Sequence, residues 1–177
     1  MAVIASAVAV TASSVAIGAP GTPAGGSIHV FGSSPGTGGG GKVLITGAIG
    51  DHGSTKSVNK SGRANANGSY VKLTLTKGTI ELNKTKLDAN INHAFGSAVV
   101  NSATCSLTVV ASGTLPVVNG TGLYKGISGS VRITLSLGLT LPRYASGAHA
   151  GQCNQSNAAQ PTASLQLVEG TGSVSFS

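Results

Sequence analysis

Hydrophobic and polar residues alternate along most of the chain, which is the pattern of strands that bury one face. The clearest run covers 131–141, where apolar residues take every second position and Pro142 follows. Shorter runs of the same kind occupy 71–75, 80–83, 87–91, 107–111 and 165–176, the last with a kink expected at its glycines. Three consecutive apolar residues at 43–45 begin a further strand. Beyond the N-terminal leader, no window of twelve residues shows helical periodicity. The pattern therefore predicts an all-β domain.

The length of the clearest run favours a barrel. Its eleven residues would span roughly 36 Å at 3.3 Å per residue, which is long for a strand of an isolated sandwich. Long strands with one apolar face suit a closed sheet, because closure removes the exposed edges. We predict a single antiparallel barrel of roughly eight strands, closed or nearly closed, with a β-sandwich as the alternative.

The N-terminal segment differs from the rest. Residues 2–20 carry no charge and are rich in Ala, Val, Ser and Thr, which is typical of the apolar part of a secretory signal. The positively charged start of such a signal is missing, so either the start codon lies further upstream or the segment is something else. A membrane anchor is the alternative, although this composition would make a weak span. We expect an exported protein with no stable membrane span in its mature form.

These features divide the chain into three parts. We assign 1–24 to a signal peptide and 25–41 to a linker or arm rich in Gly and Pro. Residues 42–177 form the predicted barrel domain. Within the arm, the apolar stretch 28–31 could add a strand to a barrel edge or lie loose. The polar stretch 51–68 is interpreted as a loop, because Gly and Asn punctuate it.

Composition limits the functions that the chain can serve. Charged residues make up 8% of the chain and the formal net charge is +7, whereas an average domain is about 25% charged. The basic residues are scattered, which favours weak attraction to anionic surfaces such as acidic polymers or phospholipid headgroups. We expect no nucleic-acid binding, because the sequence has no cluster of arginines. Its three Tyr and three Phe form no close pair on which bases could stack.

The only two cysteines, Cys105 and Cys153, favour a disulfide. Such a bond would close a 48-residue interval and contribute about 4 kcal/mol through loop entropy. The rival interpretation is a metal site, for which His149 beside Cys153 is the closest pairing. Two ligands do not make a metal site, so we predict a disulfide and no metal. A disulfide also agrees with export.

The segment 119–130 is a glycine-spaced turn that leads into the long strand. It resembles the segment of allene oxide cyclase and dirigent-like barrels in which Gly-Thr-Gly, an aromatic residue and two further glycines precede a long strand. The closing segment 169–176 is similar to the last strand of that family. The layout of 42–177, about three quarters of the chain, is also similar to small secreted bacterial proteins of actinobacterial type whose function is unassigned. The shared motifs are glycine positions, which concern the fold.

The resemblance implies a barrel that holds a reactive, mostly apolar molecule, as the plant cyclases and stereochemical guides of that family do. Their pockets use a few acidic or hydroxyl groups, and none of these matches this sequence residue by residue. Glu81 and Asp88 each fall between apolar residues, so both should alternate outward. We therefore transfer the fold from the family and not its activity.

Two further patterns suggest chemistry but have simpler explanations. Gly-Thr-Gly occurs at Gly36, Gly120 and Gly170, yet a phosphate loop needs a helix directly afterwards, so turns or bulges are expected. Asp51 and His52 form the only adjacent acid and imidazole. Flanking glycines place this pair in a solvated turn, where catalysis is not expected. A metal site shared by His52, His93 and His149 stays open.

The best candidates for contact with a ligand are Tyr124, Arg143 and Tyr144. Tyrosine offers area and a hydroxyl, and arginine offers a fork for a carboxylate or phosphate. The simpler and favoured alternative is that Tyr124 packs at a barrel end and that Arg143 is solvated beyond Pro142.

Together these observations predict a secreted, non-catalytic β-barrel that binds a small apolar ligand or a cell-envelope component such as an anionic polymer, or that acts structurally. The alternative is an isomerase, a cyclase-like enzyme or a stereo-guiding protein of the same barrel. We expect no cofactor and no catalytic residue. A third hypothesis is a homo-oligomer assembled through the Gly- and Ala-rich arms.

Overall fold

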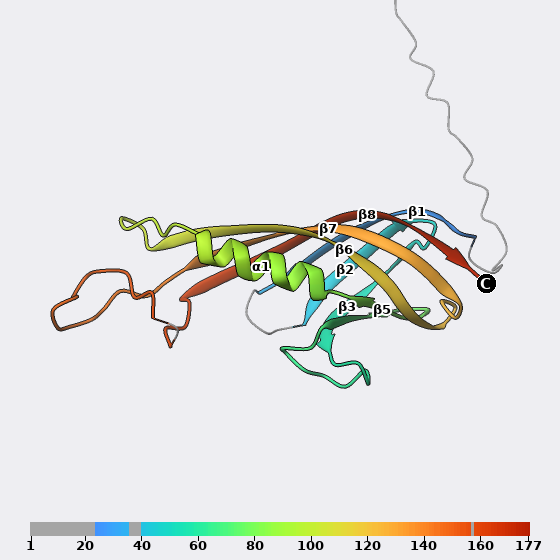
Figure 1. Ribbon diagram of the computed structural model, residues 1–177, viewed down its shortest axis with the longest axis horizontal. Helices are drawn as coiled ribbons and strands as arrows, with labels where there is room; N and C mark the ends of the chain where they lie inside the picture. The colour runs from blue at the N-terminus through green and yellow to red at the C-terminus, as the bar shows by residue number, and fades with distance from the viewer. Residues whose placement is uncertain (1–23, 36–39, 157) are drawn as a thin grey trace, which may run out of the picture.

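The computed structural model describes residues 24–35, 40–156 and 158–177. Eight strands form a closed antiparallel barrel in which each strand pairs with its neighbours in sequence and β1 pairs with β8 (Figure 1). The elements are β1 Gly26–Ser34, β2 Gly41–Gly47, β3 Asp51–Val58, β4 Tyr70–Leu75, β5 Gly78–Asn83, α1 Thr85–Ser97, β6 Ser106–Gly122, β7 Ile127–Thr140 and β8 Ala163–Phe176. The predicted eight-stranded barrel is confirmed.

The alternation of the sequence becomes the inner and outer faces of the barrel. In β7, Val131 and Ile133 are buried inside the barrel, while Arg132 between them is exposed. Strands β1, β2 and β4 to β8 contribute buried aliphatic side chains to the interior in the same way. Burial of this apolar surface is the main force that holds the barrel together.

The barrel begins at Gly26 rather than at residue 42. The segment expected to be a linker or arm contains β1, which closes the barrel between β2 and β8. Ile28 and Val30 alternate with polar or exposed neighbours and are buried in the core, so β1 follows the same rule as the other strands. Of the predicted signal peptide, all but Ala24 lies outside the described residues.

The prediction of a strand at 87–91 is wrong, because these residues belong to helix α1. Leu87 and Ile91 fit a two-residue alternation, but they are also one helical turn apart, and Ala94 follows on the same side. All three pack against the core. Gly113 of β6 allows the close approach of α1, since a Cβ atom there would lie 3.0 Å from the Cα and Cβ atoms of Leu87.

The loop expected over 51–68 is shorter than predicted, because β3 occupies its first eight residues. The inward positions of β3 are Asp51, Gly53, Thr55 and Ser57, none of which is apolar. A strand without apolar residues on its inner face lacks the hydrophobic alternation that reveals strands in a sequence. These polar inward positions give the barrel interior one hydrophilic wall.

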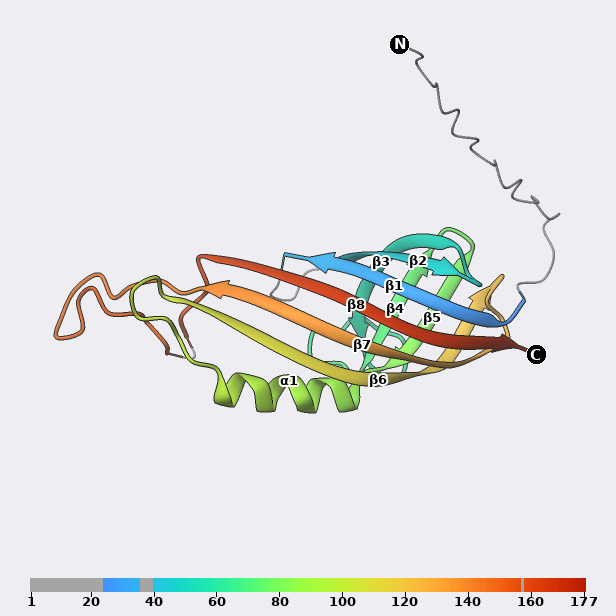
Figure 2. The same ribbon diagram turned by 90° about the horizontal axis from the view of Figure 1, so that it is seen from above.

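The three longest strands, β6, β7 and β8, project beyond the short strands at one end of the barrel (Figure 2). Their inner face carries Val109, Leu135 and Leu137, against which Ile91 and Ala94 of α1 pack. Helix α1 runs along this projecting sheet from the barrel outward. The barrel therefore has two different ends, a projecting end beside α1 and an end formed by short turns.

Candidate functional site

A cavity of about 440 Å³ lies in the barrel interior at the end beside α1. It opens between the end of β1, the start of β2, the loop that follows β3 and the first turn of α1. Its volume falls in the range of roughly 300–1,000 Å³ that is typical of sites for small molecules. The larger apolar side chains of the wall are those of Val30, Val43, Val71, Leu73, Leu82, Leu87, Ile91, Leu115, Ile133, Leu135 and Val168.

Strand β3 contributes a polar side to this wall. Thr55 and Ser57 line the cavity, and the Thr55 hydroxyl accepts a hydrogen bond from the Gly41 backbone N–H at 3.1 Å. Gln166 of β8 adds an amide. A mainly apolar cavity with a few polar groups suits a mainly apolar molecule that carries one or two hydrogen-bonding groups.

An ion pair stands at the cavity mouth. Lys84 precedes α1 and Asp88 lies one helical turn further, and the Lys84 Nζ atom donates to both Asp88 carboxylate oxygens at 2.7 and 2.8 Å. The side chains of Lys84 and Asp88 are 16% and 36% exposed. The expectation that Asp88 faces outward is therefore wrong, because it rested on a strand in place of α1. Glu81 does lie on the outer face, 3.8 Å from Lys72.

The opposite end of the barrel is closed around Asp51, which is only 4% exposed. Its carboxylate accepts hydrogen bonds from the Thr76 hydroxyl, the Tyr124 hydroxyl and the backbone N–H groups of His52, Thr76 and Lys77. These donors come from the β4–β5 and β6–β7 turns as well as from β3 itself. Asp51 thus joins three chain segments that meet at this end of the barrel.

Burial and hydrogen bonding act in opposite directions on Asp51. Burial alone would raise the pKa of its carboxyl group, but the hydrogen bonds from Thr76, Tyr124 and the backbone outweigh burial and hold the pKa well below its ordinary value. Burial, together with the hydrogen bond to the Asp51 carboxylate, raises the pKa of Tyr124. Both effects favour an ionised carboxylate that is held by a neutral phenol.

The expectation of a solvated turn at Asp51 and His52 is wrong for Asp51. Asp51 is the first residue of β3 and is buried, whereas His52 is exposed. The partners Thr76 and Tyr124 lie 25 and 73 residues away in sequence, so no local motif could reveal this site. The nearest signal is the buried Ile49 just before the acid. The site anchors the fold and does not line the cavity.

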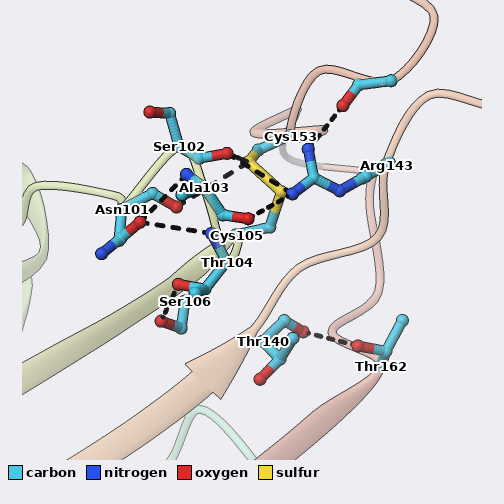
Figure 3. Close-up of a disulfide and its surroundings, with 11 residues drawn as sticks. Asn101, Ser102, Ala103, Thr104, Cys105, Ser106, Thr140, Arg143, Cys153 and Thr162 are labelled. Atoms are coloured by element: carbon cyan, nitrogen blue, oxygen red, sulfur yellow. Dashed lines mark hydrogen bonds between the residues drawn. A yellow bond between two sulfur atoms is a disulfide. The ribbon is translucent and has the colours of Figure 1, made fainter.

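The predicted ligand residues Tyr124, Arg143 and Tyr144 do not line the cavity. Tyr124 is fully buried at the closed end. Arg143 donates to the backbone oxygens of Gly151 at 2.6 Å and Ala103 at 2.7 Å (Figure 3). The ring of Tyr144 lies against that of His149, with centroids 5.7 Å apart. The structure does not bring the three residues together, and each has a partner within the protein.

The disulfide between Cys105 and Cys153 is confirmed. Figure 3 shows it beside Arg143, where it fastens the loop between β7 and β8 to the residues just before β6. Within the described ranges, no three His, Cys, Asp or Glu side chains gather closely enough to hold a metal ion. His52 lies on β3, His93 on α1 and His149 in the disulfide-fastened loop.

The Gly-Thr-Gly repeats at Gly120 and Gly170 lie within strands rather than turns. Gly120 belongs to β6, beside a register shift with β5, and Gly170 belongs to β8. At Gly170 a Cβ atom would lie 2.4 Å from the Ile133 Cδ1 atom, so glycine lets a core side chain pack against the strand backbone. Gly36 lies outside the described residues.

Comparison with protein-family models, with curated proteins and with solved structures found no match to this chain. The resemblance to the allene oxide cyclase and dirigent-like barrels therefore stays a prediction. The function must be inferred from the cavity and its surroundings.

Proposed function

We propose that this protein is an exported, non-catalytic barrel that binds a small, mainly apolar molecule in its cavity. The observation that carries the proposal is the cavity itself, about 440 Å³ of space walled by eleven Val, Leu and Ile side chains and open at one end. Protein interiors are otherwise close-packed. An apolar space that opens to solvent is best explained by a molecule that fills it.

Export is supported by the disulfide, because such bonds persist mainly in oxidising compartments. The uncharged segment 2–20 supports it as well. In the described part of the chain, no helix has the length and apolar character needed to cross a membrane.

A binding role is favoured over catalysis by the chemistry of the wall. Among the described lining residues, the ionisable ones are Lys42, Lys56, Lys84 and Asp88. The one carboxylate in this set is already paired with Lys84. Lys42 and Lys56 stand at outward positions of β2 and β3 and reach only the rim of the cavity. General acid or base catalysis needs a group that is free to exchange a proton with the substrate.

The second candidate is an isomerase, a cyclase-like enzyme or a stereo-guiding protein. The observation in its favour is the Lys84–Asp88 pair, which places an acid and an amine at the mouth of an apolar cavity. A substrate that separated the pair would release both groups for chemistry. Conversion of a bound molecule that stops in Asp88→Asn would support this candidate.

The proposal is tested with a neutral, hydrophobic fluorescent probe, N-phenyl-1-naphthylamine. Val71→Trp and Ile91→Trp fill the cavity from two walls, and Val110→Trp adds the same side chain on the outer face, where Val110 is exposed. We expect the wild type and Val110→Trp to bind the probe and both cavity variants to lose at least about 90% of binding, since the probe and the indole compete for the same space. Unchanged binding in both folded cavity variants would overturn the proposal.

A further inference from the structure

The basic residues that are scattered in the sequence gather in space around the open end of the barrel. Seven of the eleven Lys and Arg residues lie at this end, on β2 to β4, on the loop after β3 and at the start of α1. The acids at this end are Glu81 of β5 and Asp88 of α1, because Asp51 of β3 lies at the closed end. Seven positive and two negative charges leave +5 of the total +7 at this end. The basic residues are Lys42, Lys56, Lys60, Arg63, Lys72, Lys84 and Lys86.

Three of these lysines form a row across the outer face of the barrel. Lys56 of β3 pairs directly with Lys72 of β4. Lys42 of β2 pairs with Ser54, which lies two residues before Lys56 on the same face. Neighbouring strands are about 4.8 Å apart, so the row presents closely spaced ammonium groups. Like charges directly opposite each other destabilise a sheet, and a bound anion would relieve this repulsion.

The acids of this end do not neutralise the row. Glu81 lies 3.8 Å from Lys72, and Asp88 pairs with Lys84. Among the described residues, Lys42 and Lys56 have no ion-pair partner. Both are exposed and reach the cavity rim.

The loop after β3 extends this positive surface. At Gly62 a Cβ atom would lie 3.3 Å from the Glu81 Oε1 atom, so the loop lies over the outer face next to the row. Lys60 and Arg63, on either side of this glycine, are exposed. We call Lys42, Lys56, Lys60, Arg63 and Lys72 the cationic face.

Hydroxyl groups accompany the cationic face. Ser54 and Thr74 are exposed and pair with each other beside the lysine row. Exposed apolar side chains border the row on β1 and β2, where Phe31 pairs with Leu44, two residues from Lys42. Lysines interspersed with hydroxyls can contact both the carboxylates and the hydroxyls of a sugar acid.

We infer that the cationic face binds a linear acidic polysaccharide, whose carboxylates pair with the lysines and whose hydroxyls contact Ser54 and Thr74. A nucleic acid suits this face less well, because the face lacks the aromatic platforms on which bases stack. The lysine row and its hydroxyls lie on the outer face of the barrel, where only Lys42 and Lys56 also reach the cavity rim.

The test measures binding of polygalacturonate fragments to the full chain by isothermal titration calorimetry at low and at physiological salt. The variant Lys42→Gln/Lys56→Gln/Lys72→Gln removes the row. The matched control, Lys77→Gln/Lys125→Gln/Arg132→Gln, removes the same charge from exposed positions elsewhere. We expect about tenfold weaker binding for the row variant and less than a twofold change for the control, with binding weakened by salt.

Three results would overturn the inference. Equal losses of affinity in the row variant and the control variant would show attraction to net charge alone. A wild type that does not bind polygalacturonate would show that the cationic face is not a binding site for such a polymer. If polyphosphate or single-stranded DNA with the same number of charges binds as tightly as polygalacturonate, the hydroxyl contacts do not select a sugar. Thermal unfolding midpoints within about 3 °C of the wild type confirm that the variants remain folded.

Discussion

The two ends of the barrel each contain an aspartate, and the difference between them separates structure from function. Asp51 at the closed end accepts hydrogen bonds from three chain segments and is almost inaccessible to water. Asp88 at the open end is about one-third exposed and meets a single partner, Lys84. A carboxylate whose acceptor positions are all used can only hold the fold. One paired at a cavity mouth can exchange its partner for a ligand.

Loss of the aspartate at the closed end should cost more stability than loss of the aspartate at the open end. Removing one partner of a buried, hydrogen-bonded charge leaves the others unsatisfied and costs several kcal/mol, whereas exposed pairs contribute about 0–1 kcal/mol. The closed end should therefore control stability, and the open end should control binding.

The largest effect is expected from the disulfide, which stabilises the projecting side of the molecule. Replacing both Cys105 and Cys153 with Ala should lower the free energy of unfolding by about 4 kcal/mol, because the unfolded chain gains the freedom of the 48-residue loop. Urea unfolding measures the loss. The wild-type protein in reducing agent provides the control. A loss below about 1 kcal/mol in both the double variant and the reduced wild type would contradict a stabilising role of the disulfide.

Removal of the anchor at the closed end comes next. Asp51→Ala should destabilise the barrel by about 3 kcal/mol, since the hydroxyls of Thr76 and Tyr124 and two turn N–H groups lose their acceptor. Asp88→Ala is the matched control at the open end and should cost less than about 1 kcal/mol. Equal losses in the two variants, measured by urea unfolding, would abolish the distinction between the ends.

The pH dependence of stability should also separate the two ends. The pKa of Asp51 is lowered in the folded state, so its contribution is present above the ordinary value of about 3.9 and is lost as pH falls below it. The raised pKa of Tyr124 predicts a second loss above about pH 10. In unfolding curves from pH 2 to 11, Asp51→Asn should flatten the acid limb, while Asp88→Asn leaves it in place. An unchanged acid limb in Asp51→Asn would contradict this account.

The smallest effect on stability is expected at the cavity mouth. Lys84→Met should change the free energy of unfolding by less than about 1 kcal/mol, because the pair it breaks is partly solvated. It should nevertheless change the affinity for the hydrophobic probe, because Lys84 lines the cavity. A variant that unfolds readily but binds the probe normally would assign Lys84 to the fold instead.

The sequence could predict the barrel where a strand buries aliphatic side chains at every second position, as β7 does. In β8, by contrast, Leu165 and Leu167 are exposed and Val174 is buried. It could not reveal β3, whose inward positions Thr55 and Ser57 are polar. It misassigned α1, because the positions of Leu87 and Ile91 fit a strand and a helix equally well. Over five residues the two periods cannot be told apart.

Less of the candidate site than of the fold could be predicted from the sequence. A cavity is space left between side chains from distant strands, so no local pattern encodes it. The cationic face likewise arises from pairing, since Lys56 and Lys72 become neighbours only when β3 pairs with β4. Asp51 shows the same limit, because its partner Tyr124 is distant in sequence. What the sequence did show, through its two cysteines, was the disulfide.

The most direct test of the central claim is native mass spectrometry of the wild-type protein and of Val71→Trp, both secreted by the same host. A cavity that holds an apolar molecule should give the wild type an added mass, which organic solvent extracts and which the filled variant lacks. The same spectra, recorded after incubation with N-phenyl-1-naphthylamine, should show one bound probe on the wild type alone. A wild type that carries no added mass and takes up no more probe than Val71→Trp would contradict the claim.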